Sequence, residues 1–422
     1  MCATSTMTKA GPSCRRRYLP GFRQSSDTSW PTWITKYMHI AGGLYRELCE
    51  TPTWNAQFGS GGRAAAAVSA MSPGSTLHTY ARDGNNAGAD ELSALGVQLS
   101  RTHSDIAIAF AYFHPLSQPH IEPRPGTIPQ EPPIHVSGEV VLRFGFLEGS
   151  ALVHAAKAIY DPQTAVHPEP FGANGSTAKR LALVMNELEL CRYTGCPDLA
   201  TAAGNAMSND NQVTVIVVKR GVRGVTVYER NVEPITVPAY YSSQVFKIGT
   251  GDVFSAVFAH HWGEAGTSAP EAADLASRSV SAYCETMTLP VPTESLKSRE
   301  PVTGQAPSRI ILHGSTSTIG RRYTLEEARF RLKELGIDAL SPQLDEIPEP
   351  LSKNLPSLVV ADGLSTTEIR RLCETKPYRG IIVLDEERRP DVAELSSLGV
   401  TIISDFASSL YRSAWPRAFC RS

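Results

Sequence analysis

The sequence lacks the patterns that are typical of zinc proteins, membrane-spanning proteins and nucleic-acid-binding proteins. Its eight cysteines include no Cys-x-x-Cys pair, and there is no His-Glu-x-x-His motif, so the usual zinc sites have no support. No apolar run reaches the ~18 residues of a membrane-spanning helix. Lys and Arg number 40 against 42 Asp and Glu, so no general basic field favours nucleic acid. We therefore expect free thiols in a reducing, cytoplasmic compartment, with no membrane and no nucleic-acid partner.

The length of 422 residues allows two domains, and changes in composition mark their limits. Residues 1–37 carry five Lys or Arg residues before the first acid, Asp27, among many Ser and Thr. A transit peptide has this composition, but no amphipathic apolar face is apparent, so we favour a disordered or spurious N-terminal tail. Residues 289–307 are rich in Pro, Ser and Thr, which predicts a linker at 299–308.

Residues 38–298 alternate short apolar strands with helical patterns. Predicted strands include residues 155–160 and 213–218, and predicted helices include residues 176–189 and 252–262. This alternation predicts an α/β fold built from βαβ units, with ligands at the carboxyl ends of the strands.

The most informative stretch is residues 247–254, which read Lys-Ile-Gly-Thr-Gly-Asp-Val-Phe. Two glycines bracket a threonine, and an apolar run follows Asp252 at helical spacing, so the stretch predicts a glycine turn that opens a buried helix. Free N–H groups at such a turn suit a transferring phosphate, and Asp252 can take the proton of an attacking hydroxyl. A plain turn with Asp252 as the N-cap is the alternative interpretation.

This stretch resembles the C-terminal signature of ribokinase-like (PfkB-type) carbohydrate kinases, usually Asp-Thr-x-Gly-Ala-Gly-Asp before an apolar helix. It departs from that signature at Phe246 and Lys247, where the family usually has Asp-Thr, and at Thr250, which is usually Ala. The resemblance implies a ribokinase-like fold, with Asp252 as the catalytic base. The backbone amides that it assigns to the anion hole are those of Gly249, Thr250, Gly251 and Asp252.

Two earlier segments resemble the acceptor side of the same family. Residues 40–47 look like its opening strand and glycine turn, and Glu47 stands where the family often has a sugar-binding aspartate. Residues 59–67 resemble its Gly-Gly-x-Ala-x-Asn-x-Ala stretch, in which glycines let the backbone approach the sugar. Ala66 replaces the usual asparagine, and Arg63 favours an acceptor with an anionic or planar group. The substrate-binding residues assigned in this way are Glu47, Gly61, Gly62 and Arg63.

Two further segments resemble the nucleotide side. Residues 186–189, Asn-Glu-Leu-Glu, resemble the family's Asn-x-x-Glu motif, which orders magnesium and phosphate. A spacing of three on a helix puts Asn186 and Glu189 on one face. Residues 215–224 resemble the strand and glycine turn beside the nucleotide. The resemblance implies ATP and Mg²⁺ as cofactors, with the metal held by Asn186 and Glu189 through water. The cofactor-binding residues that it assigns are Asn186, Glu189, Lys219, Gly221 and Gly224.

A proline-rich excursion separates these segments. Residues 115–133 contain seven prolines, so they can form neither a helix nor a central strand, and they follow a predicted strand at 106–114. In the family a small β lid covers the acceptor, and the gap from Glu47 to Gly59 is too short for its usual first segment. We therefore expect the excursion either to cover the acceptor or to be a surface linker. Its His114 and His120 are interpreted as surface histidines.

Residues 309–422 repeat the α/β pattern on a smaller scale. This second pattern predicts a domain of roughly 115 residues, within the usual range. The predicted strands are 310–313, 358–361, 381–384 and 400–403, and the predicted helices are 323–335 and 405–415.

This second unit looks like a nucleoside 2-deoxyribosyltransferase-like domain, which implies a flavodoxin-like α/β fold and a nucleoside ligand. In that family the glutamate of an Asp-Pro-Gly-Thr-x-x-Glu segment is the nucleophile. Here Asp362 and Glu368 keep the spacing of six, but Pro-Gly-Thr is absent. Glu368 is therefore interpreted first as a solvated helix residue and second as a nucleophile. The residues that carry the resemblance are 310–315, 321–329, 340–342 and 362–363.

Together these patterns predict an enzyme that moves the γ-phosphoryl group of ATP to a hydroxymethyl of a small-molecule sugar or nucleoside, with a second domain that binds a nucleoside. One alternative is a catalytically dead nucleotide-binding sensor, which the departures at Ala66, Phe246 and Lys247 favour. Another is a working nucleoside deoxyribosyltransferase or hydrolase in the C-terminal half. We also expect that the protein can form a homodimer.

Overall fold

The structure is a computed structural model, and it describes residues 37–82, 87–164, 166–294, 296–345, 355–374 and 380–415. All of these residues belong to one compact unit, Thr35–Ser422. The predicted N-terminal tail lies outside the described residues, except for Tyr37. Among the described residues, no helix is long and apolar enough to cross a membrane.

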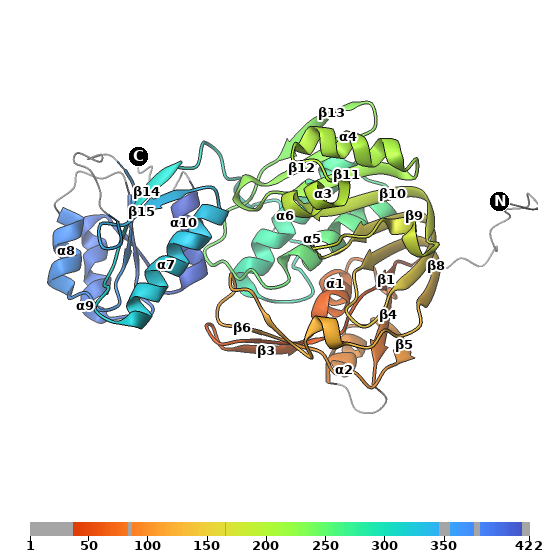
Figure 1. Ribbon diagram of the computed structural model, residues 1–422, viewed down its shortest axis with the longest axis horizontal. Coiled ribbons are helices and arrows are strands. Elements are labelled where there is room, and N and C mark those ends of the chain that lie inside the picture. The colour runs from red at the N-terminus through yellow and green to blue at the C-terminus, as the bar shows by residue number, and fades with distance from the viewer. Residues whose placement is uncertain are drawn as a thin grey trace, which may run out of the picture. The chain divides into compact units, whose positions relative to one another are not determined.

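A nine-stranded sheet forms the larger part of this unit, in the order β13-β12-β11-β10-β9-β8-β1-β4-β5 (Figure 1). Seven of its strands run parallel to their neighbours, and β12 and β13 continue the sheet in antiparallel pairing at one edge. The strands are β1 (His39–Ala41), β4 (Thr76–Ala81), β5 (Gln98–His103), β8 (Ile134–Phe144), β9 (Ala151–Asp161), β10 (Thr177–Asn186), β11 (Val213–Lys219), β12 (Val225–Glu229) and β13 (Val232–Val237).

Helices cover both faces of this sheet, as expected for a sheet of parallel strands. One apolar cluster packs α1, α5 and α6 against it, and a second packs α3 and α4. The helices are α1 (Gly59–Val68), α2 (Ala87–Ala94), α3 (Glu187–Thr194), α4 (Leu199–Asn209), α5 (Thr250–Phe258) and α6 (Ala269–Thr286), and a π-helix, Ala259–Glu264, continues α5. The predicted strands at 155–160 and 213–218 and the predicted helix at 252–262 are thereby confirmed, with β9, β11 and α5 as their counterparts.

The predicted helix at 176–189 is wrong. Residues Thr177–Asn186 form β10, in the middle of the sheet, and the helix α3 begins only at Glu187. The run from Leu181 to Met185 is buried on both faces of the sheet. A short, continuously apolar run reads alike for a buried strand and a buried helix, so periodicity could not separate the two.

A four-stranded sheet, β3-β2-β6-β7, lies beside the acceptor side of the fold. Its strands are β2 (Arg46–Cys49), β3 (Trp54–Gln57), β6 (Ala109–Tyr112) and β7 (His120–Glu122). The gap between Glu47 and Gly59 is therefore long enough for a lid segment, contrary to our expectation, because β2 and β3 pair there as an antiparallel hairpin. The proline-rich excursion supplies only β7 and a short 3-10 helix, Pro125–Thr127.

The C-terminal residues form a separate five-stranded parallel sheet in the order β15-β14-β16-β17-β18. Helices α7 and α10 pack on one face and α8 and α9 on the other. All strands predicted for this unit are present, and β15 is added at an edge. The elements are β14 (Arg309–His313), α7 (Ile319–Glu334), β15 (Asp338–Leu340), β16 (Ser357–Val360), α8 (Thr366–Glu374), β17 (Ile381–Leu384), α9 (Pro390–Ala393), β18 (Thr401–Ile403) and α10 (Phe406–Ala414).

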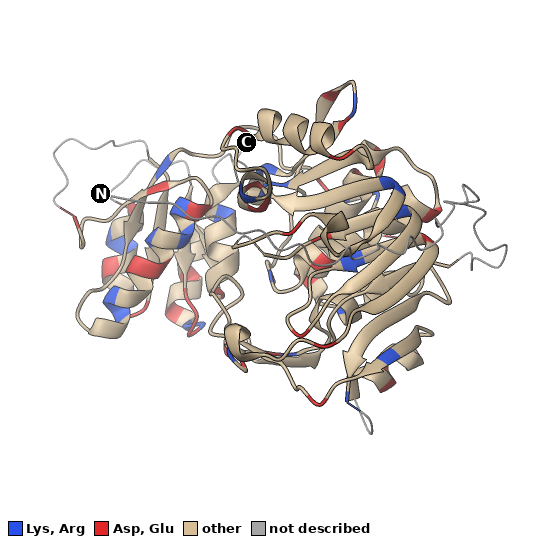
Figure 2. Ribbon diagram, turned by 45° about the vertical axis from the view of Figure 1, so that its right-hand side comes forward, with Lys and Arg blue, Asp and Glu red and all other residues tan. Residues whose placement is uncertain are grey.

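The two sheets are joined by more than the chain. The predicted linker at 299–308 is tied to the larger part, since the Val302 N–H donates to the Ala239 carbonyl at 2.8 Å. The Val245 N–H donates to Ser408 Oγ of α10, also at 2.8 Å. Basic and acidic segments lie close together on the helices of the C-terminal part (Figure 2), as in the ion pair between Arg329 and Glu326. The domain limits at 298 and 309 stay a prediction.

Candidate active site

The glycine turn before α5 has the conformation that its sequence predicted. Gly249 is left-handed, with φ of 74°, and a Cβ there would lie 2.2 Å from side-chain atoms of Arg63, so only glycine fits. The Thr250 N–H donates to the Lys247 carbonyl at 3.3 Å. The N–H groups of Gly251 and Asp252 have no acceptor among the described residues. Two free donors therefore stand at the positive end of the α5 dipole.

Two cavities meet at Gly251. A cavity of about 460 Å³ beside the four-stranded sheet is lined by Asp252, Glu47 and Gln163, together with four aromatic residues. A cavity of about 320 Å³ on the other side reaches from Lys219 and Asn186 to α6. We call these the acceptor cavity and the nucleotide cavity. The free N–H groups of the turn therefore stand where the two cavities adjoin.

Asp252 lies between these donors and the acceptor cavity and is 6 % exposed. Arg63 Nη1 donates to its Oδ2 at 3.1 Å, and Gln163 Nε2 donates to its Oδ1 at 2.5 Å. Burial raises the pKa of Asp252 to about 7, although the Arg63 guanidinium opposes the shift. A carboxylate with a pKa near neutrality can accept a proton and release it again.

Arg63 links the base to the predicted sugar ligand. Its side chain is fully buried, with 0 % exposed. Nη1 donates to Glu47 Oε1 at 3.0 Å and Nη2 to Oε2 at 2.6 Å, while Nε donates to the Tyr283 hydroxyl at 3.1 Å. Both Glu47 and Asp252 line the acceptor cavity, whereas Arg63 stands behind them. The Arg63 guanidinium thus binds its carboxylate partners and is not among the residues that line the acceptor cavity. Its contact with the acceptor stays a prediction.

A further buried carboxylate, Asp161 at the end of β9, was not among the predicted site residues. It is 1 % exposed, and its Oδ2 accepts from Lys219 Nζ and from Ser255 Oγ, both at 2.7 Å. Its Oδ1 is buried and has no partner among the described residues. The position of Asp161 directly after an apolar strand was the available signal, because ligands gather at the carboxyl ends of parallel strands.

Asn186 and Glu189 do lie together, but in a different relation from the one predicted. Asn186 is the N-cap of α3, and Asn186 Oδ1 accepts from the Glu189 N–H at 2.9 Å. Glu189 Oε2 accepts from the Asn186 N–H at 2.7 Å, which completes a capping box. Burial raises the pKa of Glu189, and the nearby Lys219 ammonium lowers it.

The remaining predicted nucleotide residues follow β11. Lys219, Gly221 and Gly224 all line the nucleotide cavity. Gly224 has φ of 78°, and a Cβ there would lie 2.1 Å from the Val237 carbonyl oxygen. The glycine turn therefore lets β12 fold back beside the cavity.

The predicted acceptor glycines have a packing role. A Cβ on Gly61 would lie 2.5 Å from the Gly42 carbonyl group, so Gly61 lets α1 approach the turn after β1. A Cβ on Gly62 would lie 2.8 Å from the Leu44 side chain. From the start of α1, it is Gly59 and Ser60 that line the acceptor cavity.

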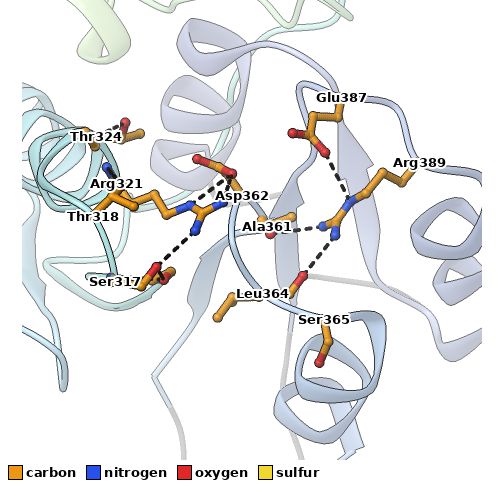
Figure 3. A network of polar contacts seen from close by, with 12 residues as sticks. Ser317, Thr318, Arg321, Thr324, Ala361, Asp362, Leu364, Ser365, Glu387 and Arg389 are labelled. Atoms are coloured by element: carbon orange, nitrogen blue, oxygen red, sulfur yellow. Dashed lines mark hydrogen bonds and ion pairs between the residues drawn. The ribbon is translucent and has the colours of Figure 1, made fainter.

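The candidates in the C-terminal part, Asp362 and Glu368, are both exposed, and Figure 3 shows Asp362 beside Arg321. Asp362 Oδ1 accepts from Arg321 Nη2 at 3.2 Å. Glu368 Oε2 accepts from the N–H and from the hydroxyl of Ser365, each at 2.7 Å. These bonds lower the pKa of Glu368. Arg370, two residues further along α8, pairs with Glu374 at 4.0 Å. Glu368 thus caps the start of α8.

The described residues contain no metal site built from protein side chains alone. Among the described residues, no group of three or more His, Cys, Asp or Glu side chains is placed to hold a metal ion. The five cysteines that the structure describes are free thiols, as predicted.

Comparison with known proteins matches part of the chain to one family. No curated protein matches the sequence. The ribokinase of Arabidopsis thaliana, solved with ribose and ATP, shares 18 % identity, with 62 % of this chain and 97 % of that chain covered and a TM-score of 0.47. The ribokinase of Cryptococcus neoformans var. grubii serotype A, solved with ADP, shares 17 %, with 63 % and 99 % covered and a TM-score of 0.47. A pyrophosphate-dependent kinase in the ribokinase family, solved with a pyrophosphate analog and myo-inositol, shares 15 %, with 62 % and 99 % covered and a TM-score of 0.43.

The profile of the pfkB family carbohydrate kinases matches residues 170–292. This span holds the Asn186 and Glu189 motif, the turn after β11 and the glycine turn at Asp252. Residues 170–292 are therefore similar to part of a pfkB family carbohydrate kinase.

Proposed function

We propose that this protein transfers the γ-phosphoryl group of ATP to a hydroxymethyl of a sugar or nucleoside. The observation that carries the proposal is the meeting of the two cavities at Gly251. At that point two unpaired amide donors and one buried carboxylate, Asp252, stand together. Phosphoryl transfer needs positioned reactants and neutralised charge more than covalent chemistry from the protein.

The roles follow from the atoms at this junction. An acceptor hydroxyl in the acceptor cavity gives its proton to Asp252 as the oxygen attacks phosphorus. Each carboxylate oxygen of Asp252 accepts more than one hydrogen bond, so Arg63 and Gln163 can stay bound. The N–H groups of Gly251 and Asp252 donate to the phosphoryl oxygens, on which charge is spread in the transition state.

The residues around Lys219 fit a magnesium ion held through water. Asp161 Oδ1 is a buried oxygen without a donor, and Glu189 lies near the same ammonium group. Mg²⁺ prefers oxygen ligands and keeps several waters, so Asn186, Glu189 and Asp161 would hold it through those waters. Mg²⁺ would neutralise phosphate charge. Lys219 already supplies one positive charge next to the turn, since a Cβ on Gly251 would lie 3.6 Å from its Nζ.

The acceptor cavity suits a ring with hydroxyl groups. Its aromatic walls offer faces on which a sugar or base can pack. Ser60 Oγ is buried, without a partner among the described residues, and so is free to bond a hydroxyl. The aromatic residues that line it are Tyr45, Phe110, Tyr112 and Phe146.

One experiment tests the proposal directly. The protein is incubated with Mg-ATP and a panel of sugars and nucleosides, and ADP release is followed for each acceptor. We expect at least one acceptor to raise ADP release well above the rate with water alone. Equal rates for the whole panel, from protein that binds ADP, would leave the nucleotide-binding sensor as the better account.

For the C-terminal part we propose binding of a nucleoside or nucleotide-like ligand without chemistry. Its parallel strand order, 2-1-3-4-5 in chain order, is the flavodoxin-like order, and ligands of such sheets lie at the carboxyl ends of the strands. Asp362 and Ser317 stand at these ends, bridged by Arg321. The exposed position of Glu368 argues against a glycosyl-enzyme there, because a nucleophile needs a shielded site.

A further inference from the structure

Helix α10, which belongs to the C-terminal part, lines the nucleotide cavity of the kinase part. Tyr411 lies on this helix, and Trp415 directly follows it. We propose that the end of α10 is a working part of the nucleotide site: Trp415 binds the base, and Tyr411 positions Lys247 for the phosphates. This inference rests on the proposed function, because it takes the cavity to be where the nucleotide binds.

Trp415 carries an unused donor at this cavity. Its side chain is 3 % exposed, and its indole N–H is buried without an acceptor among the described residues. A buried donor without an acceptor costs free energy, which a ligand that accepts from it would recover. The nucleoside bases all present ring nitrogens or carbonyl oxygens as acceptors.

The rest of this end of the cavity suits a flat apolar ring. Apolar side chains from the turn after β11, from β12, α5 and α6, and from the loop before α5 line the same cavity as Trp415. The Tyr241 ring supports the indole edge-on, at 5.3 Å between ring centres. An aromatic base is the part of a nucleotide that such a wall accommodates. The apolar wall residues are Val222, Val225, Val245, Phe254 and Val280.

Lys247 adds a charge to the lining of the same cavity. It lies two residues before Gly249, and its Nζ lies 5.6 Å from the centre of the Tyr411 ring. Among the described residues no carboxylate lies within ion-pair distance of it, whereas Lys219 is paired with Asp161. A half-buried ammonium without an anionic partner, in a cavity that Gly251 also lines, is placed to bind phosphate.

Contacts with the kinase part hold α10 at the cavity. Ser408 accepts from the Val245 N–H, and the Phe406 ring packs on His114 with 4.7 Å between ring centres. His114 also lies 3.3 Å from Glu327 of α7. Val222 and Val245 share one apolar cluster with α7 and α10. These contacts hold Tyr411 and Trp415 at the nucleotide cavity.

Two variants and two probes separate the proposed roles. ADP carries a base and phosphates, and inorganic tripolyphosphate carries phosphates alone. Trp415→Phe keeps a ring but removes the donor, so the Kd for ADP should rise about three- to tenfold, as for one lost hydrogen bond, with tripolyphosphate unaffected. Lys247→Met should weaken both probes. Phe330→Leu, on the exposed face of α7, is the control and should change neither Kd.

Hydrogen exchange of the unaltered protein provides a test that does not depend on the variants folding. ADP should slow amide exchange in residues 406–415 as well as in residues 219–225 and 249–254. If ADP protects the last two segments but not 406–415, and Trp415→Phe binds ADP as the unaltered protein does, the inference is overturned and the kinase proposal stands. If the unaltered protein does not bind ADP, the proposed function fails first.

Discussion

The carboxylates around the proposed phosphoryl-transfer site and those of the C-terminal part differ in their surroundings. Glu47, Asp161 and Asp252 are almost completely buried, and each is matched by Arg63 or Lys219. In the C-terminal part the Asp362 side chain is 49 % exposed, and Glu368 is open to solvent. Charge that is buried and matched by a specific cation has been placed there at a cost, whereas exposed charge costs little.

The pKa shifts of Asp252 and Glu368 differ in direction, and this difference supports the same contrast. Burial raises the pKa of Asp252 to about 7, while hydrogen bonds from Ser365 lower the pKa of Glu368. A raised pKa in a cavity is typical of a group that exchanges protons, and a lowered pKa from local bonds is typical of a helix cap. A match to a motif's spacing, as at Asp362 and Glu368, is therefore weaker evidence for an active site than a buried network of paired charges.

The strongest test of this contrast is the proposed base. Asp252→Asn keeps the shape and hydrogen bonding of the side chain but removes its basicity, so turnover should fall by about 10²–10⁴-fold. The rate of ADP release with the best acceptor measures the effect. Asp198→Asn, at the exposed N-cap of α4, is the control and should keep full activity. A folded Asp252→Asn variant with near-normal turnover would remove Asp252 from the mechanism.

The second test concerns Arg63. Arg63→Met leaves Glu47 and Asp252 buried without their cation, which should lower the free energy of unfolding by about 3–5 kcal/mol. Urea unfolding measures this, with Arg322→Met, on the exposed surface of α7, as the control.

The milder Arg63→Lys variant tests the electrostatic role by its pH profile. Below pH 7 the unaltered enzyme should gain about tenfold in kcat/KM per pH unit and then level off, because only ionised Asp252 accepts a proton. A lysine cannot reach Glu47 and Asp252 in the same fork. The pKa of Asp252 should therefore rise, and the profile should move to higher pH. An unchanged profile would mean that Arg63 only packs.

The third test asks whether α3 serves the metal or only its own cap. Glu189→Gln should raise the Mg²⁺ concentration for half-maximal rate by about 10–100-fold, as expected for groups that act on a metal through water. Glu187→Gln, two residues earlier in the same helical turn, removes an acid that pairs with Arg220 and Arg223. That control should leave the Mg²⁺ dependence unchanged. If both variants change the Mg²⁺ dependence to the same extent, Asn186 and Glu189 act only as the capping box of α3.

Local features of the site could be predicted from the sequence, and distant partners could not. The turn at Gly249 and the helix behind Asp252 follow from neighbouring residues, and the structure has both. The bond from Arg63 to Asp252 joins residues 189 positions apart, so no local pattern announces it. Without that contact the sequence indicates Arg63 as a substrate ligand, and this assignment stays a prediction. Trp415 was missed for the same reason, because it follows α10 and lines the cavity far along the chain from the glycine turn.

The last test, with the smallest expected effect, concerns the C-terminal pair. Glu368 and Ser365 bond each other reciprocally at the start of α8, so Glu368→Ala and Ser365→Ala should each lower the midpoint of thermal unfolding slightly and to a similar extent. Neither variant, nor the unaltered full chain, should release or exchange bases of deoxyribonucleosides. Base release that disappears in Glu368→Ala but persists in Ser365→Ala would assign the glutamate a chemical role, because both variants lose the cap and only one loses the carboxylate. The C-terminal part would then be an enzyme in its own right.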